Sequence, residues 1–215
     1  MKYNVILLAA GKGSRSGLSY NKVFYPITDS KTVLDCSLDL FLNDPECTGI
    51  IIVCAAYEKE KMEKEYCRSP LISTCIGGAT RQESVYNGLT MVKEDYVFIH
   101  DGARPYVKKE QIEDLKKTLE TEDACLLMVP STDTSKIVED GYVKETLVRS
   151  TVYNAQTPQC FRTDLIKMCY QKGKEEKKEA TDDAQLVEWY SSVPVKAVLS
   201  DPSNIKITHP TDLKN

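Results

Sequence analysis

The residues best suited to do chemistry lie near the N-terminus, in a segment rich in small residues. A run of alanines leads into Gly11 and Gly13, and two cations follow at Arg15 and Lys22. Small residues let a backbone approach a ligand closely, and glycine permits the turns that aim successive N–H groups at one point. Phosphate oxygens are the usual occupants of such a turn. The two cations could hold a polyphosphate and offset the charge that develops as a P–O bond breaks.

This glycine turn does not identify a nucleotide site by itself. It lacks the Gly-Lys-Ser/Thr ending of a P-loop. It also lacks the third glycine of a dinucleotide-binding fold, because Ser16 stands where glycine is needed and Gly17 falls one place late. A tight structural turn therefore remains an alternative, and the rest of the chain has to decide.

Composition bounds the class of protein. The chain has 215 residues, 41% hydrophobic and 28% charged, which predicts one soluble domain over residues 1–215. A net charge of −4 opposes general nucleic-acid binding, and no apolar run approaches the ~20 residues of a membrane span. We expect a cytoplasmic protein with no nucleic-acid or membrane partner. The eight cysteines form no C-x-x-C pair and are expected to be reduced structural thiols.

Apolar runs alternate with helical patterns along the chain. Strands are predicted at residues 3–8, 49–56, 72–76, 96–100, 124–129, 194–199 and 204–208. Helices are predicted at residues 34–42, 57–66, 108–121, 163–172 and 181–190, with one more opened by Gly77 and Gly78. The link over 173–179 is expected to be a charged loop. This alternation predicts an α/β, Rossmann-like fold whose sheet is mostly parallel and has helices on both faces.

Three polar motifs each follow a predicted strand, at Gly11, Gly77 and Asp101. In open parallel sheets the ligand lies beyond the carboxyl ends of the strands. We therefore expect these motifs to converge on one crevice.

Residues 131–153 interrupt the alternation. Two β-prone runs flank Asp140-Gly141, which is a strong hairpin signal. A hairpin that projects from a domain has two free edges, and free edges pair readily with another chain. The segment is therefore predicted to be a dimerisation arm, with a hairpin packed on its own domain as the alternative.

Seven short motifs together resemble a known family. They are Ala9-Ala10-Gly11-x-Gly13-x-Arg15 with Lys22, Gly77-Gly78-x-x-Arg81-x-x-Ser84-Val85, His100 to Pro105, Asp133-Thr134, Gln156 to Gln159, Thr181 to Ala184, and Asn204 to Thr208. In this order they are similar to the 2-C-methyl-D-erythritol 4-phosphate cytidylyltransferases of the non-mevalonate isoprenoid pathway. The resemblance spans nearly the whole chain. Asn21 departs from it, since relatives usually have proline before the lysine.

The resemblance implies a fold like that of nucleotide-diphospho-sugar transferases and a transfer of CMP. The sugar-alcohol phosphate would attack the α-phosphorus of CTP, and pyrophosphate would leave. Mg²⁺ or another divalent cation would be bound through the CTP phosphates, with no metal ligand assigned among the side chains. The resemblance also implies a homodimer formed through the arm over residues 131–153.

The resemblance assigns roles to individual positions. The catalytic residues would be Arg15, Lys22 and Lys206. CTP would be bound by Ala9, Ala10, Gly11, Gly13, Gly77, Gly78, Ser84, Asp101 and Ala103. The acceptor would be bound by Asp101, Arg104, Thr157 and Lys206, and by Thr134 and Arg149 of the arm acting in the partner subunit's site.

Other interpretations stay open. A cytidylyltransferase acting on ribitol 5-phosphate would share the nucleotide half, although such relatives more often have Ser-Val where this chain has Gly102-Ala103. A non-catalytic nucleotide-binding module would not need the reaction-centre cations, and the glycine spacing disfavours a nicotinamide-dependent dehydrogenase. Structural roles also remain: Gly77-Gly78 as the start of a helix, Asp101 as a helix cap, and Arg149 as a surface charge.

Overall fold

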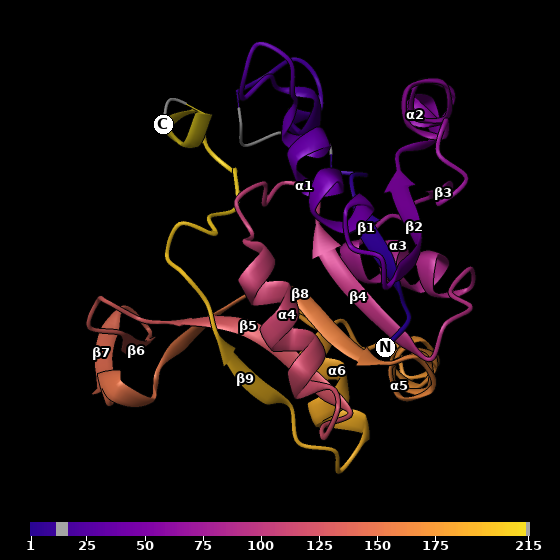
Figure 1. Cartoon of the computed structure of the whole chain (residues 1–215). Helices are drawn as coiled ribbons and strands as arrows, with labels where there is room; N and C mark the ends of the chain where they lie inside the picture. The colour runs from indigo at the N-terminus through magenta and orange to yellow at the C-terminus, as the bar shows by residue number, and fades with distance from the viewer. Residues whose placement is uncertain (12–16, 214–215) are drawn as a thin grey trace.

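A seven-stranded sheet forms the centre of the computed structural model, which describes residues 1–11 and 17–213 (Figure 1). Its strands are β1 (Tyr3–Leu8), β2 (Cys47–Cys54), β3 (Ile72–Ile76), β4 (Tyr96–Asp101), β5 (Ala124–Pro130), β8 (Tyr153–Arg162) and β9 (Lys196–Leu199). They lie in the order β3-β2-β1-β4-β8-β5-β9. β1 to β4 pair in parallel and β9 is parallel to β5, whereas β8 runs antiparallel to both β4 and β5. The predicted α/β fold with a mostly parallel sheet is confirmed.

Helices cover both faces of the sheet. They are α1 (Val33–Leu42), α2 (Lys59–Tyr66), α3 (Arg81–Leu89), α4 (Lys109–Thr118), α5 (Thr163–Glu175) and α6 (Asp183–Tyr190). Side chains alternate along β1, so Val5 and Leu7 pack with α1, α2 and α4 in one core, while Ile6 packs with α3, α5 and α6 in the other. Burial on both faces explains why β1 is apolar at nearly every position.

Helices α3 and α6 both begin at side-chain caps. The hydroxyl of Thr80 accepts the N–H of Glu83 at the start of α3, and the carboxylate of Asp182 accepts the N–H of Gln185 at the start of α6. Such caps satisfy N–H groups that the first helical turn leaves unpaired. The caps therefore fix the positions from which the side chains of Arg81 and Asp183, the first residues of these two helices, project.

β8 is a central strand that the sequence pattern did not predict. It contains Gln156, Thr157 and Pro158, and proline has no N–H for a sheet ladder. The pairing of β8 with β5 is irregular here, because Leu126 pairs with Gln159 whereas Met128 pairs with Ala155. Pro158 therefore lies where the ladder is already interrupted.

The predicted strand over 204–208 is wrong. These residues form no strand, and the segment from Ser200 to His209, called here the C-terminal segment, crosses the ends of the sheet instead. In Figure 1 it rises from β9 toward the carboxyl ends of the parallel strands and leads into the short 3₁₀ helix η4 (Pro210–Leu213). The N–H of Ile207 donates to the carbonyl of Ala103, which ties the segment to the loop after β4.

Residues 136–146 form the predicted hairpin. β6 (Lys136–Glu139) and β7 (Tyr142–Thr146) pair antiparallel with each other as a separate sheet that projects from the domain (Figure 1). Asp140 and Gly141 have φ of 50° and 83°, the left-handed backbone that a tight hairpin turn requires. The strands carry exposed apolar side chains, with Val138 56%, Tyr142 80% and Val143 62% exposed.

Two smaller points concern the helices. The charged link expected as a loop over 173–179 begins later, because its first three residues continue α5 to Glu175. None of the helices in the described part of the chain is long and apolar enough to cross a membrane.

Candidate active site

The loops after β1 and β3 meet at the carboxyl end of the sheet. A Cβ at Gly77 would lie 2.8 Å from the Cβ of Ala10 and 2.9 Å from the Oγ of Ser84, so only glycine fits between them. The N–H of Gly77 donates to the carbonyl of Cys54, and the N–H of Gly78 donates to the Ser84 hydroxyl. The glycine pair therefore lets the start of α3 pack against the end of β1. The start of a helix alone would not require this close contact.

The loop after β4 lies against the same strand end. The N–H of Gly102 donates to the carbonyl of Leu8 at 2.9 Å, and a Cβ at position 102 would lie 3.0 Å from that oxygen. The motifs at Gly77 and Asp101 thus lie beside the end of β1, in the one crevice that the strand order predicts.

Asp101, the last residue of β4, lies between two cations. Its Oδ2 is 2.7 Å from the Nζ of Lys206, and its Oδ1 is 3.5 Å from the Nε of Arg81. Burial raises the pKa of the Asp101 carboxyl, but the charges of Arg81 and Lys206 outweigh burial and hold the pKa well below its usual range. Asp101 is therefore a permanent anion at neutral pH, and it is not a helix cap.

Arg81 extends this cluster to a second carboxylate. Its Nη1 and Nη2 donate to the two oxygens of Asp183 at 2.8 and 2.7 Å, in the fork geometry that guanidinium and carboxylate groups favour. Asp183 is fully buried, and it also accepts the Tyr170 hydroxyl. The sequence motif contained Arg81 and Asp183, but nothing in their spacing assigned them a role.

His100 lies beneath Asp101 and is fully buried. Its Nδ1 is 3.0 Å from the hydroxyl of Thr157, and its Nε2 is 3.1 Å from the carbonyl of Arg104. The same Thr157 hydroxyl accepts the N–H of Asp101. Burial lowers the pKa of His100 to about 4, so the ring is neutral at pH 7 and holds the loop after β4 in place.

The C-terminal segment is anchored by a buried asparagine. The amide of Asn204 donates to the Oε1 of Gln156 and to the carbonyl of Thr157, while the carbonyl of Asn204 accepts the Nη1 of Arg104 at 2.7 Å. Burial lowers the pKa of Arg104. This anchoring places Lys206, two residues further on, against Asp101. Gln156 and Asn204 are thus site-forming residues that received no individual role from the sequence.

The predicted site residues fall into three groups. Residues at the shared crevice are Ala9, Ala10, Gly77, Gly78, Ser84, Asp101, Ala103, Arg104, Thr157 and Lys206. The second group consists of Gly11, Gly13, Arg15 and Lys22, which follow β1. Gly11 continues the chain from Ala10, and a Cβ added to it would have no described atom within 4 Å. Gly13 and Arg15 lie outside the described residues. Lys22 is the first residue of the 3₁₀ helix η1 (Lys22–Phe24), and the preceding Asn21 donates its amide to the Ala9 carbonyl.

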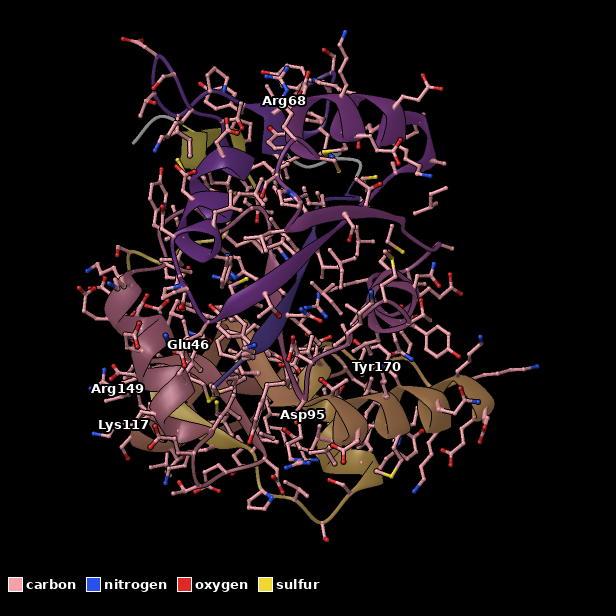
Figure 2. All side chains as sticks on the ribbon, turned by 45° about the vertical axis from the view of Figure 1, so that its right-hand side comes forward. Glu46, Arg68, Asp95, Lys117, Arg149 and Tyr170 are labelled. Carbon is pink, nitrogen blue, oxygen red and sulfur yellow. The ribbon has the colours of Figure 1, made fainter. Side chains whose placement is uncertain are left out.

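Thr134 and Arg149 form the third group, on the arm. Both are exposed, and in residues 1–11 and 17–213 no hydrogen bond or ion pair joins either side chain to the crevice. Figure 2 shows Arg149 far from Tyr170, whose hydroxyl reaches the buried end of the Arg81 cluster. Within a single chain, the structure does not bring the two arm residues to the crevice.

The structure gathers glycine-containing loops and the cations Arg81 and Lys206 at the carboxyl end of an open α/β sheet, the position where such folds bind nucleotides. No group of three or more His, Cys, Asp or Glu side chains placed to hold a metal occurs among the described residues. The protein is thus, by fold and site, an α/β protein of the nucleotide-binding class.

Comparison with known proteins gives the family. A model of the 2-C-methyl-D-erythritol 4-phosphate cytidylyltransferase (IspD) family matches residues 3–215, and the chain belongs to that family. Enzymes named 2-C-methyl-D-erythritol 4-phosphate cytidylyltransferase are similar along almost their whole length. The one from Bacillus velezensis is 38% identical, with 99% of this chain and 93% of the relative covered. The one from Halalkalibacterium halodurans is 40% identical, with 99% and 94% covered.

A solved structure agrees with this assignment. The crystal structure of 4-diphosphocytidyl-2C-methyl-D-erythritol synthase from Anaerococcus prevotii matches with a TM-score of 0.85 at 32% identity. The match covers 99% of this chain and 94% of that one. The fold resemblance predicted from the seven motifs is confirmed.

Proposed function

We propose that this protein transfers CMP from CTP to 2-C-methyl-D-erythritol 4-phosphate and releases pyrophosphate. Membership of the family supports the reaction, and the observation that carries it here is the Asp101–Lys206 pair at the carboxyl end of the sheet. An oxygen of the acceptor phosphate attacks the α-phosphorus of CTP and forms a new P–O bond. The bond from the α-phosphorus to the pyrophosphate oxygen breaks, and pyrophosphate takes the electron pair.

This chemistry needs cations more than it needs a base. The acceptor phosphate is already ionised at neutral pH, and phosphoryl transfer depends mainly on positioning and on charge stabilisation. His100 does not serve as a base, because both of its ring nitrogens already have partners within the protein. We assign Lys206, held by Asp101, together with Lys22 and Arg15 to the charge that accumulates around the α-phosphorus.

The remaining roles follow the layout of the crevice. Residues at the end of β1 and at the start of α3 would line the nucleotide: Ala9, Ala10, Gly11, Gly13, Gly77, Gly78, Ser84 and Ala103. Asp101 would contact both substrates through the loop that it shares with Ala103. On the acceptor side, Arg104 and Thr157 are proposed to line the pocket that binds the sugar-alcohol phosphate. The Nε of Arg104 is buried and has no hydrogen-bond partner among the described residues, which supports a role in contacting a ligand.

Mg²⁺ is proposed to enter as part of the nucleotide substrate. Both oxygens of Asp101 face cations, and the described residues offer no metal cluster. The side chains of the described residues therefore do not fit a resident metal, and the ion would be held by the phosphates of CTP. Its contribution would be to neutralise triphosphate charge.

The arm is proposed to join two copies of the chain into a homodimer with composite sites. Its exposed apolar side chains, Val138, Tyr142 and Val143, need a partner surface, and its strands pair only with each other among the described residues. In the dimer, Thr134 and Arg149 would reach the acceptor phosphate in the partner subunit's site. The eight cysteines are all free, which supports a reducing compartment, and we propose the cytoplasm.

An acceptor competition assay tests the reaction. Purified protein with CTP and Mg²⁺ should release pyrophosphate faster with 2-C-methyl-D-erythritol 4-phosphate than with ribitol 5-phosphate. The opposite preference would replace the proposed acceptor with ribitol phosphate. No release with either acceptor, despite measurable CTP binding, would favour a non-catalytic binding module.

Subunit complementation tests the composite site. Lys22→Ala and Arg149→Ala, each of low activity alone, are unfolded together and refolded as a mixture. If Arg149 acts across the interface, each mixed dimer has one site without a lesion, and the mixture recovers about a quarter of the wild-type activity. No recovery, or a fully active monomer by light scattering, would contradict the composite site.

A further inference from the structure

Four charged side chains form a line from the buried start of α6 to the carboxyl end of β4. Asp183 holds the two terminal nitrogens of Arg81 at 2.8 and 2.7 Å, Arg81 reaches Asp101 at 3.5 Å, and Asp101 holds Lys206 at 2.7 Å. Negative and positive charges alternate along this line. Each group is therefore attracted by both of its neighbours.

The two ends of the line differ in their surroundings. The Asp183 side chain is 0% exposed, whereas that of Lys206 is 37% exposed. The N–H groups of Asp183 and Ala184 both donate to the Oε1 of Gln159, and the Tyr170 hydroxyl donates to the Asp183 carboxylate. The buried end is thus fixed from several directions, while the crevice end can reach a substrate.

The distances show how Asp183, at the fixed end, controls the position of Lys206 at the other end. Asp183 occupies both Nη groups of Arg81, which leaves Asp101 only the longer contact with Nε. Asp101 is then free to give its second oxygen to Lys206. Without the charge on Asp183, the guanidinium would turn toward Asp101 and pair with both of its oxygens, because two parallel N–H···O bonds are the favoured geometry. Lys206 would lose its anchor.

We propose that Asp183 is a positioning residue for the reaction: it acts through Arg81 to keep the Asp101–Lys206 pair in its reactive geometry. The inference rests on the proposed function for its kinetic consequence, but the change in side-chain pairing does not depend on activity. Asp183 itself would touch neither CTP nor the acceptor.

The first test is the crystal structure of the full-length Asp183→Asn variant, which removes one charge and keeps the shape. The expected result is a two-point pair between Arg81 and Asp101, with the Nζ of Lys206 no longer in ion-pair contact with Asp101. An Asp101–Lys206 pair that stays in place would overturn the proposal. This outcome is independent of whether the wild type proves to be a cytidylyltransferase.

The second test is kinetic. Asp183→Asn should lower kcat about tenfold or more and leave the KM for CTP within about threefold, because small displacements of a catalytic group act on the rate. Val187→Ala, on the same helix and fully buried, is the matched control for lost stability. Equal kcat losses in the two variants would mean that Asp183 is only structural and would overturn the proposal.

A double-mutant cycle separates positioning from bulk packing. If Asp183 acts through Lys206, then Lys206→Met should slow Asp183→Asn much less than it slows the wild type. Fully additive losses would overturn the proposal. Should Asp183→Asn fail to fold, Tyr170→Phe removes one bond to the same carboxylate and keeps the ring. It should lower kcat in the same direction, and an unchanged kcat would count against the proposal.

Discussion

Replacing His100 should change how stability depends on pH. The ring is fully buried against Phe41, and burial lowers its pKa from the ordinary 6.5 to about 4. Between these two pH values the unfolded chain binds a proton that the folded chain excludes. The contribution of the neutral His100 ring to the free energy of unfolding is therefore fully present above about pH 6.5 and is lost as the pH falls toward 4. The pKa difference corresponds to roughly 3 kcal/mol of unfolding free energy.

The assay is urea unfolding at pH 7, 5.5 and 4 for the wild type and His100→Gln, which cannot titrate. The variant should be less stable at pH 7, because it loses contacts to Thr157 and to the Arg104 carbonyl. Its deficit should shrink by roughly 3 kcal/mol by pH 4. His209→Gln, which replaces the only other histidine, an exposed one, is the matched control. A His100→Gln curve that runs parallel to the wild-type curve would refute the reasoning.

Three further predictions concern separate parts of the molecule. Lys22→Ala should lower kcat by ~10²-fold, as loss of one preorganised charge contact does; an unchanged rate would remove Lys22 from the mechanism. Gly77→Ala should raise the KM for CTP about tenfold, because the new methyl group would meet Ala10 at 2.8 Å and displace the loop; an unaltered KM would place the nucleotide elsewhere. Lys116→Met should cost about 3 kcal/mol in urea unfolding, since it leaves Asp44 buried without its cation 3.0 Å away. Because Lys116 lies at the amino end of the sheet, kcat should not change, and a large fall in kcat would show coupling that the structure does not contain.

The parts of the fold with strong local signals could be predicted from the sequence. β1 is a continuous apolar run buried on both faces, and the hairpin turn carries Asp140-Gly141, whose backbone needs positive φ. β8 could not be predicted in this way. Pro158 is a poor strand former and Gln156 has no strong preference for strands, and β4 and β5 on either side, rather than the composition of β8, hold it in the sheet.

The C-terminal segment misled the sequence analysis for a related reason. Ile205 and Ile207 alternate with polar residues as in a strand, but no neighbouring strand is available to pair with them. Scattered contacts hold the segment instead, among them the bond from the Ile207 N–H to the Ala103 carbonyl, the buried Asn204 and the Lys108–Asp201 ion pair. Lys206 reaches the crevice because of these contacts, which no local pattern encodes.

The candidate active site also shows what local sequence patterns can and cannot predict. Its loops were predicted because glycines and cations follow strand ends at recognisable positions. The pairing of Arg81 with Asp183 joins residues 102 positions apart, and it depends on two helix caps and on the packing of α3 near α6. Side-chain geometry of this kind is fixed by tertiary packing, so the sequence supplied the residues but not their partnership.

The most direct test of the proposed reaction centre is the single-turnover rate of Lys206→Met with saturating CTP and 2-C-methyl-D-erythritol 4-phosphate. Lys31→Met is the matched control, since Lys31 also pairs with an aspartate, Asp39, at 2.6 Å, but on the exposed surface. We predict a fall of ~10²-fold or more for Lys206→Met and no change for Lys31→Met. A wild-type rate for Lys206→Met would contradict the placement of the reaction beside Asp101.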